Sequence, residues 1–554
     1  MLRHVQGDYA QTLEEFKRTI DLAFAGGVTQ VKVHGYPYAN APGAVWPGWS
    51  PMSSQYPTID TYYNTLAFSN VLTLIGFGEQ WGDRQPMWRH WPAMSDYVAR
   101  TSQILQRGRP RVDVAIYRQE YALSSEEPGF PAKSLGETGF TYEYVDAHSL
   151  TADALAVEDG RLGASLAGYR AVVLDERALA PDVAARLAEL AEDGLAVVIV
   201  GRQPDRAPGF RGPESNDRRV QESIARLLLA PRVRQVEEPD DVRAALERLG
   251  VEPDVVYTGG APLTAVHRQT EGADYWYLLN QSDERVRVMA SFSAKGPPRE
   301  LDAWRGTISE LALYRRREGR VELPMTLEPH GTRLIAFSRR TGEPKVHVIS
   351  TTADDAAYRG RAIEIRDYQG GEREIVLSNG TSKRLSLPAV PESVELRRWR
   401  LLVDDWRPSG PFRHDLELDE LRDWREISEL RDTSGVGTYS TVFELPPEWR
   451  SRGLGVELDL GVVEGSVRVV VNGEIAAPQS VADRPIAIGH LLRDGANHVT
   501  IELATTLRNR LHALGRGGDP NYARFLSKEP ATQPYGLLGP VRLVPYAERV
   551  VEER

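Results

Sequence analysis

The chain of 554 residues contains no cysteine, and this absence excludes several kinds of chemistry. Disulfide bonds, thiol nucleophiles and cysteine-ligated zinc sites are all impossible in it. Any bound metal would need oxygen or imidazole ligands, and hard cations such as calcium prefer oxygen.

Long apolar segments and an excess of basic residues are also missing. No stretch approaches the roughly 18 apolar residues of a membrane-spanning helix, and the opening residues MLRHVQGDYAQ lack the apolar core of a secretory signal. The 67 basic residues are outnumbered by 78 acidic ones, for a net charge of −11. Nucleic-acid-binding proteins normally present a basic face. We therefore expect neither a membrane nor a nucleic acid as partner. Oligomeric state and cellular location stay open, since a longer form could still be secreted or periplasmic.

The residues that are present are typical of a large globular protein rich in aromatic side chains. Hydrophobic residues make up 41% of the chain and charged residues 26%, as in ordinary globular domains. At roughly 150 residues per domain, the length predicts three or four domains. The 11 Trp and 22 Tyr supply flat faces on which the C–H patches of sugars can stack. Core packing remains the ordinary role of any single aromatic residue.

The first 33 residues predict a helix followed by a strand. Residues 12–25 place apolar side chains on one face at the helical period, and Thr12 and Glu15 have the spacing of a capping box. The glycine pair after this segment is a helix stop. The β-branched run at 28–33 then predicts a buried strand.

A long aromatic loop and a second helix complete this region. The loop contains the stretches GYPY, PGW and GFGEQWGDRQPMW, and an amphipathic helix is predicted from about residue 92 to 108. A helix, a strand, a functional loop and a helix are typical of the last unit of a (β/α)₈ barrel. We therefore expect residues 1–110 to form the C-terminal part of a catalytic barrel whose earlier strands precede this chain.

Residues 111–254 change to an alternation of apolar strands and helices. VDVAIY (112–117), YRAVVLDE (169–176) and LAVVIVG (195–201) are runs of the kind that is buried on both faces. Helices are predicted between and after them, which indicates a flavodoxin-like parallel α/β layer. No G-x-G-x-x-G motif follows the first strand, so a dinucleotide site is not predicted. An amidotransferase-type activity for this layer fails because it needs a cysteine nucleophile.

The rest of the chain has the alternating pattern of half-buried strands. We expect a β-sandwich domain over 255–396 and a galactose-binding-like jelly roll over 397–554. Asn472-Gly473 predicts a tight hairpin turn in the second of these domains. The predicted fold class is thus multidomain: α/β with a partial barrel end, followed by all-β domains.

The aromatic loop near the N-terminus supplies the candidate sugar-binding residues. His34 follows the predicted strand at the functional end of a barrel, where its imidazole could hydrogen-bond a sugar hydroxyl; a structural histidine is the alternative. Glu79 has glycines nearby and is the best-placed carboxylate for general acid or base work; a solvated loop carboxylate is the alternative. The predicted stacking wall consists of Tyr36, Tyr38, Trp46, Trp49 and Trp81.

These features together resemble large bacterial α-L-rhamnosidase-like enzymes of glycoside hydrolase family 106, in their C-terminal half. The stretches that carry the resemblance include AGGVTQVKVHGYPY (25–38), VDVAIY (112–117), YWYLLNQS (275–282), LDAWRG (301–306), LEPHGTRLIAF (327–337), SGVGTYSTVFELP (434–446), RVVVNG (468–473) and YGLLGPVRLVPY (535–546). NG turns and GTY strands also occur in other multidomain glycosidases, so the order of the domains is the more specific signal.

The resemblance implies hydrolysis of α-L-rhamnosides with inversion, by two glutamates and with a bound calcium ion. Neither glutamate matches a residue of this chain. Asp459, Asp483 and Asp494 are oxygen donors that could hold calcium, although turn-forming aspartate is their default role.

Two functions follow as hypotheses. The first is an α-L-rhamnosidase-like glycoside hydrolase acting on rhamnose-containing glycans or glycosides, with the catalytic carboxylates outside this chain and no turnover by the chain alone. The alternative is a non-catalytic carbohydrate-binding or scaffold protein. An in-frame extension upstream of Met1 with two candidate glutamates would favour the first.

Overall fold

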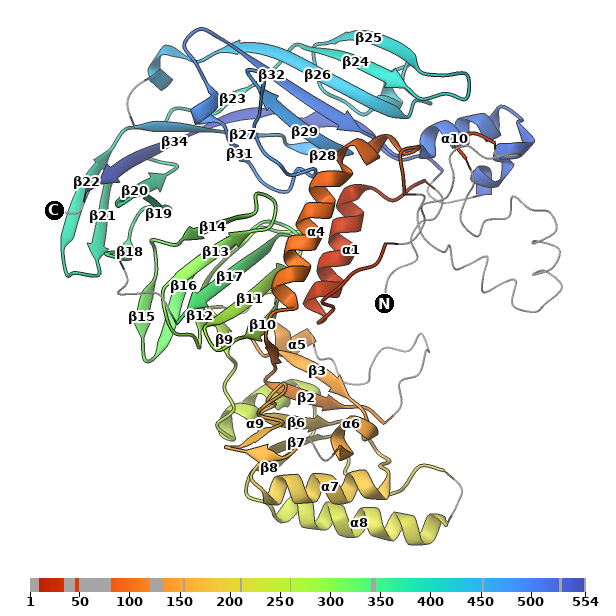
Figure 1. The fold of residues 1–554 in the computed structure, drawn as a ribbon, viewed down its shortest axis with the longest axis vertical. Helices are drawn as coiled ribbons and strands as arrows, with labels where there is room; N and C mark the ends of the chain where they lie inside the picture. Colours follow the sequence, from red (N-terminus) through yellow and green to blue (C-terminus); the bar gives the residue numbers. More distant parts are fainter. Residues whose placement is uncertain are drawn as a thin grey trace.

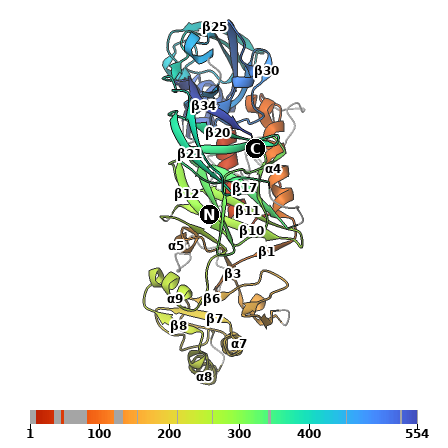
Figure 2. The ribbon, with the colours of Figure 1, turned by 90° about the vertical axis from the view of Figure 1, so that its left-hand side faces the viewer.

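The computed structural model describes residues 9–33, 45–48, 81–119, 133–152, 155–209, 212–259, 261–339, 345–450, 453–527 and 531–552. They form an elongated molecule of three stacked parts (Figure 1). An α/β unit occupies one end, a β-sandwich the middle and a larger β unit the other end; Figure 2 shows the same stacking from the side. No helix in the described ranges is long and apolar enough to span a membrane.

Two helices, α1 (Leu13–Ala25) and α4 (Trp91–Leu105), run along the sandwich. The predicted capping box begins α1: the Thr12 hydroxyl accepts from the Glu15 amide at 3.1 Å, and the Glu15 carboxylate accepts from the Thr12 amide at 2.9 Å. A short 3-10 helix, η1 (Pro86–His90), leads into α4. The apolar faces of both helices share one core with the neighbouring sheet, which includes Tyr277. Both predicted helices of this region are confirmed.

The strand predicted at residues 28–33 is not formed, and this prediction was wrong. The segment has no regular secondary structure, and Val28 and Val33 are 41% and 39% exposed. β-branched residues favour a strand only where a neighbouring strand pairs with the backbone and a surface covers the side chains. Among the described residues no strand pairs with this segment. Whether residues 1–110 belong to a barrel therefore stays a prediction.

The α/β unit has a five-stranded parallel sheet with helices on both faces, as the apolar runs predict. The strand order is β3-β2-β6-β7-β8, which is the order 2-1-3-4-5 along the sheet. One face packs on α6, α7 and α8 and the other on α5 and α9. The elements are β2 (Val114–Tyr117), α5 (Lys133–Gly136), β3 (Tyr142–Val145), α6 (Ala147–Thr151), β4 (Val157–Glu158), β5 (Arg161–Leu162), β6 (Ala171–Leu174), α7 (Pro181–Glu192), β7 (Ala196–Val200), α8 (Pro213–Leu229), β8 (Val233–Val236), η2 (Pro239–Asp241) and α9 (Val242–Arg248).

The middle part consists of two antiparallel sheets that enclose one apolar core. The first sheet has the order β1 (Arg109–Arg111), β10 (Leu263–Gln269), β11 (Ala273–Asn280), β17 (Thr332–Ser338), β13 (Pro298–Asp302) and β14 (Thr307–Glu310). The second has the order β15 (Arg315–Arg317), β16 (Arg320–Leu327), β12 (Val286–Phe292) and β9 (Val255–Tyr257). Helices α1 and α4 cover the outer face of the first sheet, so this sheet is packed on both sides.

The largest β unit also has two main sheets, and strands of both contribute to one core. One sheet runs β25 (Phe412–Leu418), β24 (Trp399–Asp405), β26 (Gly435–Glu444), β32 (Ala496–Ala504), β29 (Ser466–Val471) and β30 (Glu474–Ile475). The other runs β19 (Asp355–Arg359), β20 (Ala362–Asp367), β34 (Arg542–Val551), β27 (Leu454–Asp459) and β31 (Ile486–Ala487), with β23 (Val394–Glu395) also paired to β34. Smaller elements are β18 (Val348–Thr351), β21 (Gly371–Leu377), β22 (Ser382–Leu387), β28 (Val462–Glu464), β33 (Gly536–Gly539), the 3-10 helices η3 (Trp424–Glu426), η4 (Pro447–Arg450), η5 (Gly489–Leu491) and η6 (Pro520–Ser527), and α10 (Arg508–Arg516).

Two details of this unit bear on the predictions. The hairpin turn at Asn472-Gly473 is confirmed, since both residues have positive φ (52° and 89°) between β29 and β30. Strands β19 and β20 lie before the predicted boundary at residue 396, yet β20 pairs with β34 at the far end of the chain. The segment before residue 396 is thus built into the last unit. The assignment of a jelly roll stays a prediction.

Candidate functional site between the parallel sheet and the sandwich

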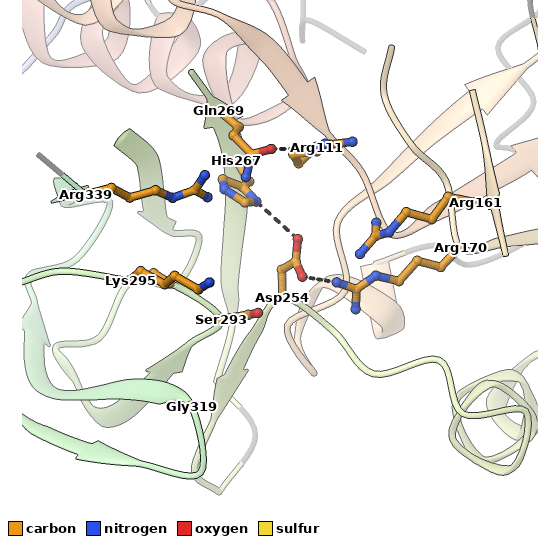
Figure 3. A pocket seen from close by; sticks show the side chains of 11 residues that line it. Arg111, Arg161, Arg170, Asp254, His267, Gln269, Ser293, Lys295, Gly319 and Arg339 are labelled. Carbon is orange, nitrogen blue, oxygen red and sulfur yellow. Dashed lines mark hydrogen bonds and ion pairs between the residues drawn. The ribbon is translucent and has the colours of Figure 1, made fainter. Parts of the chain in front are cut away.

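A polar cavity of about 240 Å³ lies where the α/β unit meets the β-sandwich (Figure 3). Charged side chains dominate its lining. Those that enter the argument are Arg111, Arg161, Arg170, Asp254, His267, Lys295 and Arg339. Arg161 and Arg170 come from the α/β unit, and most of the others come from the sandwich, so both parts of the molecule build the site.

The chain path explains why the two parts meet here. Strand β1 pairs with β10 at the edge of the sandwich, with Arg111 opposite His267. The next strand, β2, already belongs to the parallel sheet, and only residues 112–113 link the two. Asp113 therefore lies in the junction itself, 1% exposed.

His267 is the centre of the site. It faces inward from β10, is 3% exposed, and stacks on Trp276 of β11 with ring centroids 3.9 Å apart. Its Nδ1 lies 3.2 Å from Asp254 Oδ2 and its Nε2 lies 3.2 Å from Asp274 Oδ1. Burial disfavours the charged ring, but the hydrogen bonds to these two carboxylates outweigh it and raise the pKa of His267. When the ring is protonated, each of its nitrogens donates to one of these carboxylates.

Asp254 joins the two halves of the cavity wall. Its second oxygen forms an ion pair with Arg170 across the junction. Burial favours the neutral acid, but the hydrogen bond from His267 and the charge of Arg170 hold the pKa of Asp254 below its usual value. Asp113, behind it, has its pKa raised by burial and by the charge of Asp254. Thr141 donates its amide and hydroxyl to one oxygen of Asp113, at 3.0 and 2.9 Å.

The remaining cations differ in how they are neutralised. Arg339 pairs with Asp274 at 2.8 Å, and Arg111 donates to the Gln269 side-chain oxygen at 2.9 Å. Arg161 donates to the Gly168 carbonyl, at 3.0 Å. In the described part of the chain none of the side chains of Arg111, Arg161 and Lys295 has a carboxylate partner. Burial and the nearby charge of Arg170 lower the pKa of Arg161.

This arrangement does not provide the two carboxylates of a glycosidase. A hydrolase needs one carboxylic acid to protonate the leaving oxygen and a second carboxylate to activate water or attack the sugar. Asp254 has both oxygens engaged, and His267 has no free ring nitrogen. Asp113 has a raised pKa but does not line the cavity. The cavity is therefore suited to binding rather than to acid–base chemistry.

None of these residues was predicted from the sequence. The one usable signal is His267, which shares the inward face of the alternating strand 263–269 with Leu263 and Ala265. A polar residue on an apolar face needs buried partners. The partners come from distant segments, and no local pattern identifies them.

Most residues predicted to bind sugar lie outside the described part of the chain: His34, Tyr36, Tyr38, Trp49 and Glu79. Their roles stay predictions. Trp46 is half-buried, and its carbonyl accepts from the Tyr522 hydroxyl at 2.9 Å.

Trp81 does not lie on an open wall. It is 4% exposed, and its ring contacts Phe16 and Trp91 with centroids 5.0 and 4.9 Å away. Packing between α1 and α4 excludes solvent from this ring, so the prediction that it stacks on a sugar is corrected to a core role. Trp88 and Trp91 stack on each other, as expected of residues that pack the following helix.

The three aspartates considered for calcium do not gather into a site. Asp459 accepts from the Gly461 amide in a turn, whereas Asp483 accepts from the Trp304 indole and lies 3.8 Å from Lys17. Asp494 is exposed. Over the described ranges, no group of three or more His, Asp or Glu side chains could hold a metal ion. Calcium is therefore not assigned to these residues.

Comparison with known proteins shows what the part of the chain that builds this site is similar to. Residues 69–315, which include all the charged lining residues except Arg339, match the model of one family. That family is glycoside hydrolase family 106, alpha-L-rhamnosidase. The resemblance seen in the sequence is thereby confirmed.

Two similar proteins show the extent of the likeness. The solved structure of a rhamnosidase from Novosphingobium sp. PP1Y matches with a TM-score of 0.64 and 24% identity, over 97% of this chain and 46% of that one. A protein of Formosa agariphila described as a putative beta-glucuronidase is 23% identical over 343 residues, which are 61% of this chain and 26% of that protein. The chain thus shares its fold with the rhamnosidase along nearly its whole length but spans less than half of either relative.

Proposed function

We propose that this protein serves the hydrolysis of α-L-rhamnosidic bonds in rhamnose-containing glycans or glycosides. The observation that carries the proposal is the match of residues 69–315 to the alpha-L-rhamnosidase family. The shared fold with a solved rhamnosidase supports it. The name of the Formosa relative makes a β-glucuronide the natural competing substrate.

The finer domain assignment is part of the same proposal. Residues 1–110 contribute to a catalytic (β/α)₈ barrel, and the last unit is a galactose-binding-like jelly roll. The amphipathic helices α1 and α4 support the first assignment, and the two sheets around one core support the second. Fold alone does not fix a substrate, so the sugar must be tested directly.

A second candidate is a carbohydrate-binding or scaffold role without hydrolysis. The carboxylates in and behind the described cavity favour it, because Asp254 and Asp274 are both held in hydrogen-bonded ion pairs. In that case the chain binds carbohydrate or acts as a scaffold and does not cleave glycosidic bonds. Glu79 is then an ordinary loop carboxylate.

The experiment compares two sugars by two measurements on the purified 554-residue protein. Calorimetric titration measures binding of methyl α-L-rhamnoside and of methyl β-D-glucuronide. Release of the aryl group from the matching aryl glycosides measures hydrolysis. A Glu79→Gln variant, which keeps the side-chain size and removes the charge, accompanies both measurements.

We expect saturable binding of the rhamnoside, weaker or no binding of the glucuronide, and no multiple-turnover release by the chain alone. Preference for the glucuronide, or no binding of the rhamnoside at all, would overturn the proposal. Multiple-turnover release from the aryl rhamnoside that Glu79→Gln abolishes would exclude the second candidate and give Glu79 a catalytic role.

A further inference from the structure

We propose that the cavity between the α/β unit and the sandwich binds a small oxyanion, either a tetrahedral group such as sulfate or phosphate or the carboxylate of an acidic sugar. This site is distinct from the sugar-hydrolysing function proposed above and does not depend on it. The charged side chains around the cavity favour an anion by their direction, their number and their incomplete pairing.

Cations point into the cavity from both sides (Figure 3). Arg161 and Arg170 approach from the α/β unit, and Lys295 and Arg339 approach from the sandwich. Arg111 lies above them on the edge strand β1. A concave site lined by one sign of charge concentrates ions of the opposite sign.

The positive charge is not fully neutralised by the surrounding protein. With imidazolium at His267, the lining carries six cationic groups, namely five Arg or Lys side chains and this ring. The carboxylates that face them are Asp254 in the lining and Asp113 and Asp274 behind it. Arg111, Arg161 and Lys295 are the cations left without a carboxylate partner in the described part of the chain.

Repulsion among the cations lowers the pKa of two of them. Burial lowers the pKa of Arg111, and the charges of Arg109 and Arg161 lower it further. The pKa of Arg161 falls for the same reasons, with Arg170 as the neighbouring charge. An oxyanion between these side chains would relieve the repulsion and supply the missing hydrogen-bond acceptors.

Asp254 does not compete with such a ligand. One of its oxygens is held by Arg170 and the other by His267, so both are already engaged. The hydroxyl of Ser293, which also lines the cavity, is a further donor for an oxyanion.

The size of the cavity limits the ligand to a small one. Its volume of about 240 Å³ exceeds by far the roughly 10–15 Å³ that one water needs. It is below the roughly 300–1,000 Å³ of pockets for drug-sized ligands. A single ion or one acidic sugar unit fits this volume, whereas a long glycan or a nucleic acid does not.

The test compares wild type with the double variant Arg161→Gln/Lys295→Gln. Both side chains line the cavity, and neither holds a carboxylate that would be left unpaired. The matched control is Arg218→Gln/Arg219→Gln, which makes the same change of net charge on the exposed face of α8. Calorimetric titration in low-salt buffer uses sodium sulfate, phosphate, D-glucuronate and, at equal ionic strength, sodium chloride. The neutral sugar D-glucose is included for comparison.

We expect saturable binding of at least one oxyanion to wild type and to the control, and at least tenfold weaker binding to Arg161→Gln/Lys295→Gln. Tighter binding of glucuronate than of sulfate and phosphate identifies a sugar carboxylate as the ligand group, and the reverse order identifies a tetrahedral oxyanion. Equal binding by all three proteins, or a response that chloride reproduces, overturns the proposal.

A thermal unfolding series separates binding from a purely structural role. If the cations serve only to join the two units, the double variant melts earlier than the control without any ligand. If they form the proposed site, the double variant melts no earlier than the control without ligand, because removing two cations relieves their repulsion, and it loses the stabilisation that the oxyanion gives to wild type. The first pattern contradicts the proposal.

Discussion

The buried ion pair Lys17–Asp21 gives the sharpest test of how the N-terminal helix is attached. Lys17 Nζ lies 2.8 Å from Asp21 Oδ2, and these residues are 4% and 0% exposed. The other oxygen of Asp21 accepts from the hydroxyls of Tyr97 on α4, at 2.7 Å, and Tyr277 on β11, at 2.9 Å. One carboxylate thus joins α1 to the second helix and to the sandwich.

The expected cost of Asp21→Asn follows from what it leaves behind. The substitution removes the charge that compensates Lys17, whose remaining carboxylate neighbour, Asp483, is 3.8 Å away. Removing one partner of a buried ion pair costs about 3–5 kcal/mol because the other charge stays buried. Adding Lys17→Met removes that charge as well. We expect the double variant to regain about 1–3 kcal/mol relative to Asp21→Asn alone.

Hydrogen exchange of the α1 amides measures this effect locally. A loss of about 3–5 kcal/mol corresponds to roughly 150- to 5,000-fold faster exchange, and the amides of α7 in the remote α/β unit serve as an internal control. Partial recovery in the Lys17→Met/Asp21→Asn protein supports the buried-charge account. Independent effects would make the rate increase in the double variant equal to the product of the increases in Lys17→Met and Asp21→Asn. That result would refute the reasoning.

Three further predictions address the site and the terminal unit. The pKa of His267 is raised in the folded state, so the stability that its charge contributes is complete below the ordinary value near 6.5 and is lost as pH rises through the raised pKa. Urea unfolding from pH 6 to 9 should show this loss in wild type. The same dependence of unfolding stability on pH in His267→Gln would contradict it. Gly437→Ala would place Cβ 2.5 Å from the Trp424 ring and should lower unfolding stability by about 1–3 kcal/mol, measured by thermal unfolding; a neutral result would mean that the ring can move aside. In Gly473→Ala the added Cβ meets no atom within 4 Å, but the backbone keeps a φ of 89°. We therefore expect a smaller loss of unfolding stability, of about 1 kcal/mol. A loss equal to that of Gly437→Ala would show that the backbone conformation of the turn is not the cause.

Local signals were sufficient wherever a single segment carried all the information. The capping box at Thr12 and Glu15, the two amphipathic helices and the Asn472-Gly473 turn are properties of a few neighbouring residues. The strands of the α/β unit are apolar on both faces, and this pattern likewise predicts a sheet that is covered on both sides. The family resemblance also lay in the sequence, because it is spread over many short stretches.

The same local reasoning failed where the outcome depends on a partner. Residues 28–33 have strand composition but no strand beside them among the described residues. Trp81 lies in an aromatic loop stretch, yet α1 and α4 enclose it. Composition shows what a segment favours, and only packing shows which surface it meets.

The sequence by itself determined the two N-terminal helices, the parallel α/β layer, the tight turn and the family resemblance, because each depends on residues close together in the chain or on many short matches along it. Only the tertiary structure decided the charged cavity, where Arg161 and Arg170 meet Asp254 and His267 from the other side of a junction. Charges interact through space, and their pKa values depend on burial and distance rather than on spacing along the chain. For that reason the charged cavity as a whole had no counterpart in the sequence pattern.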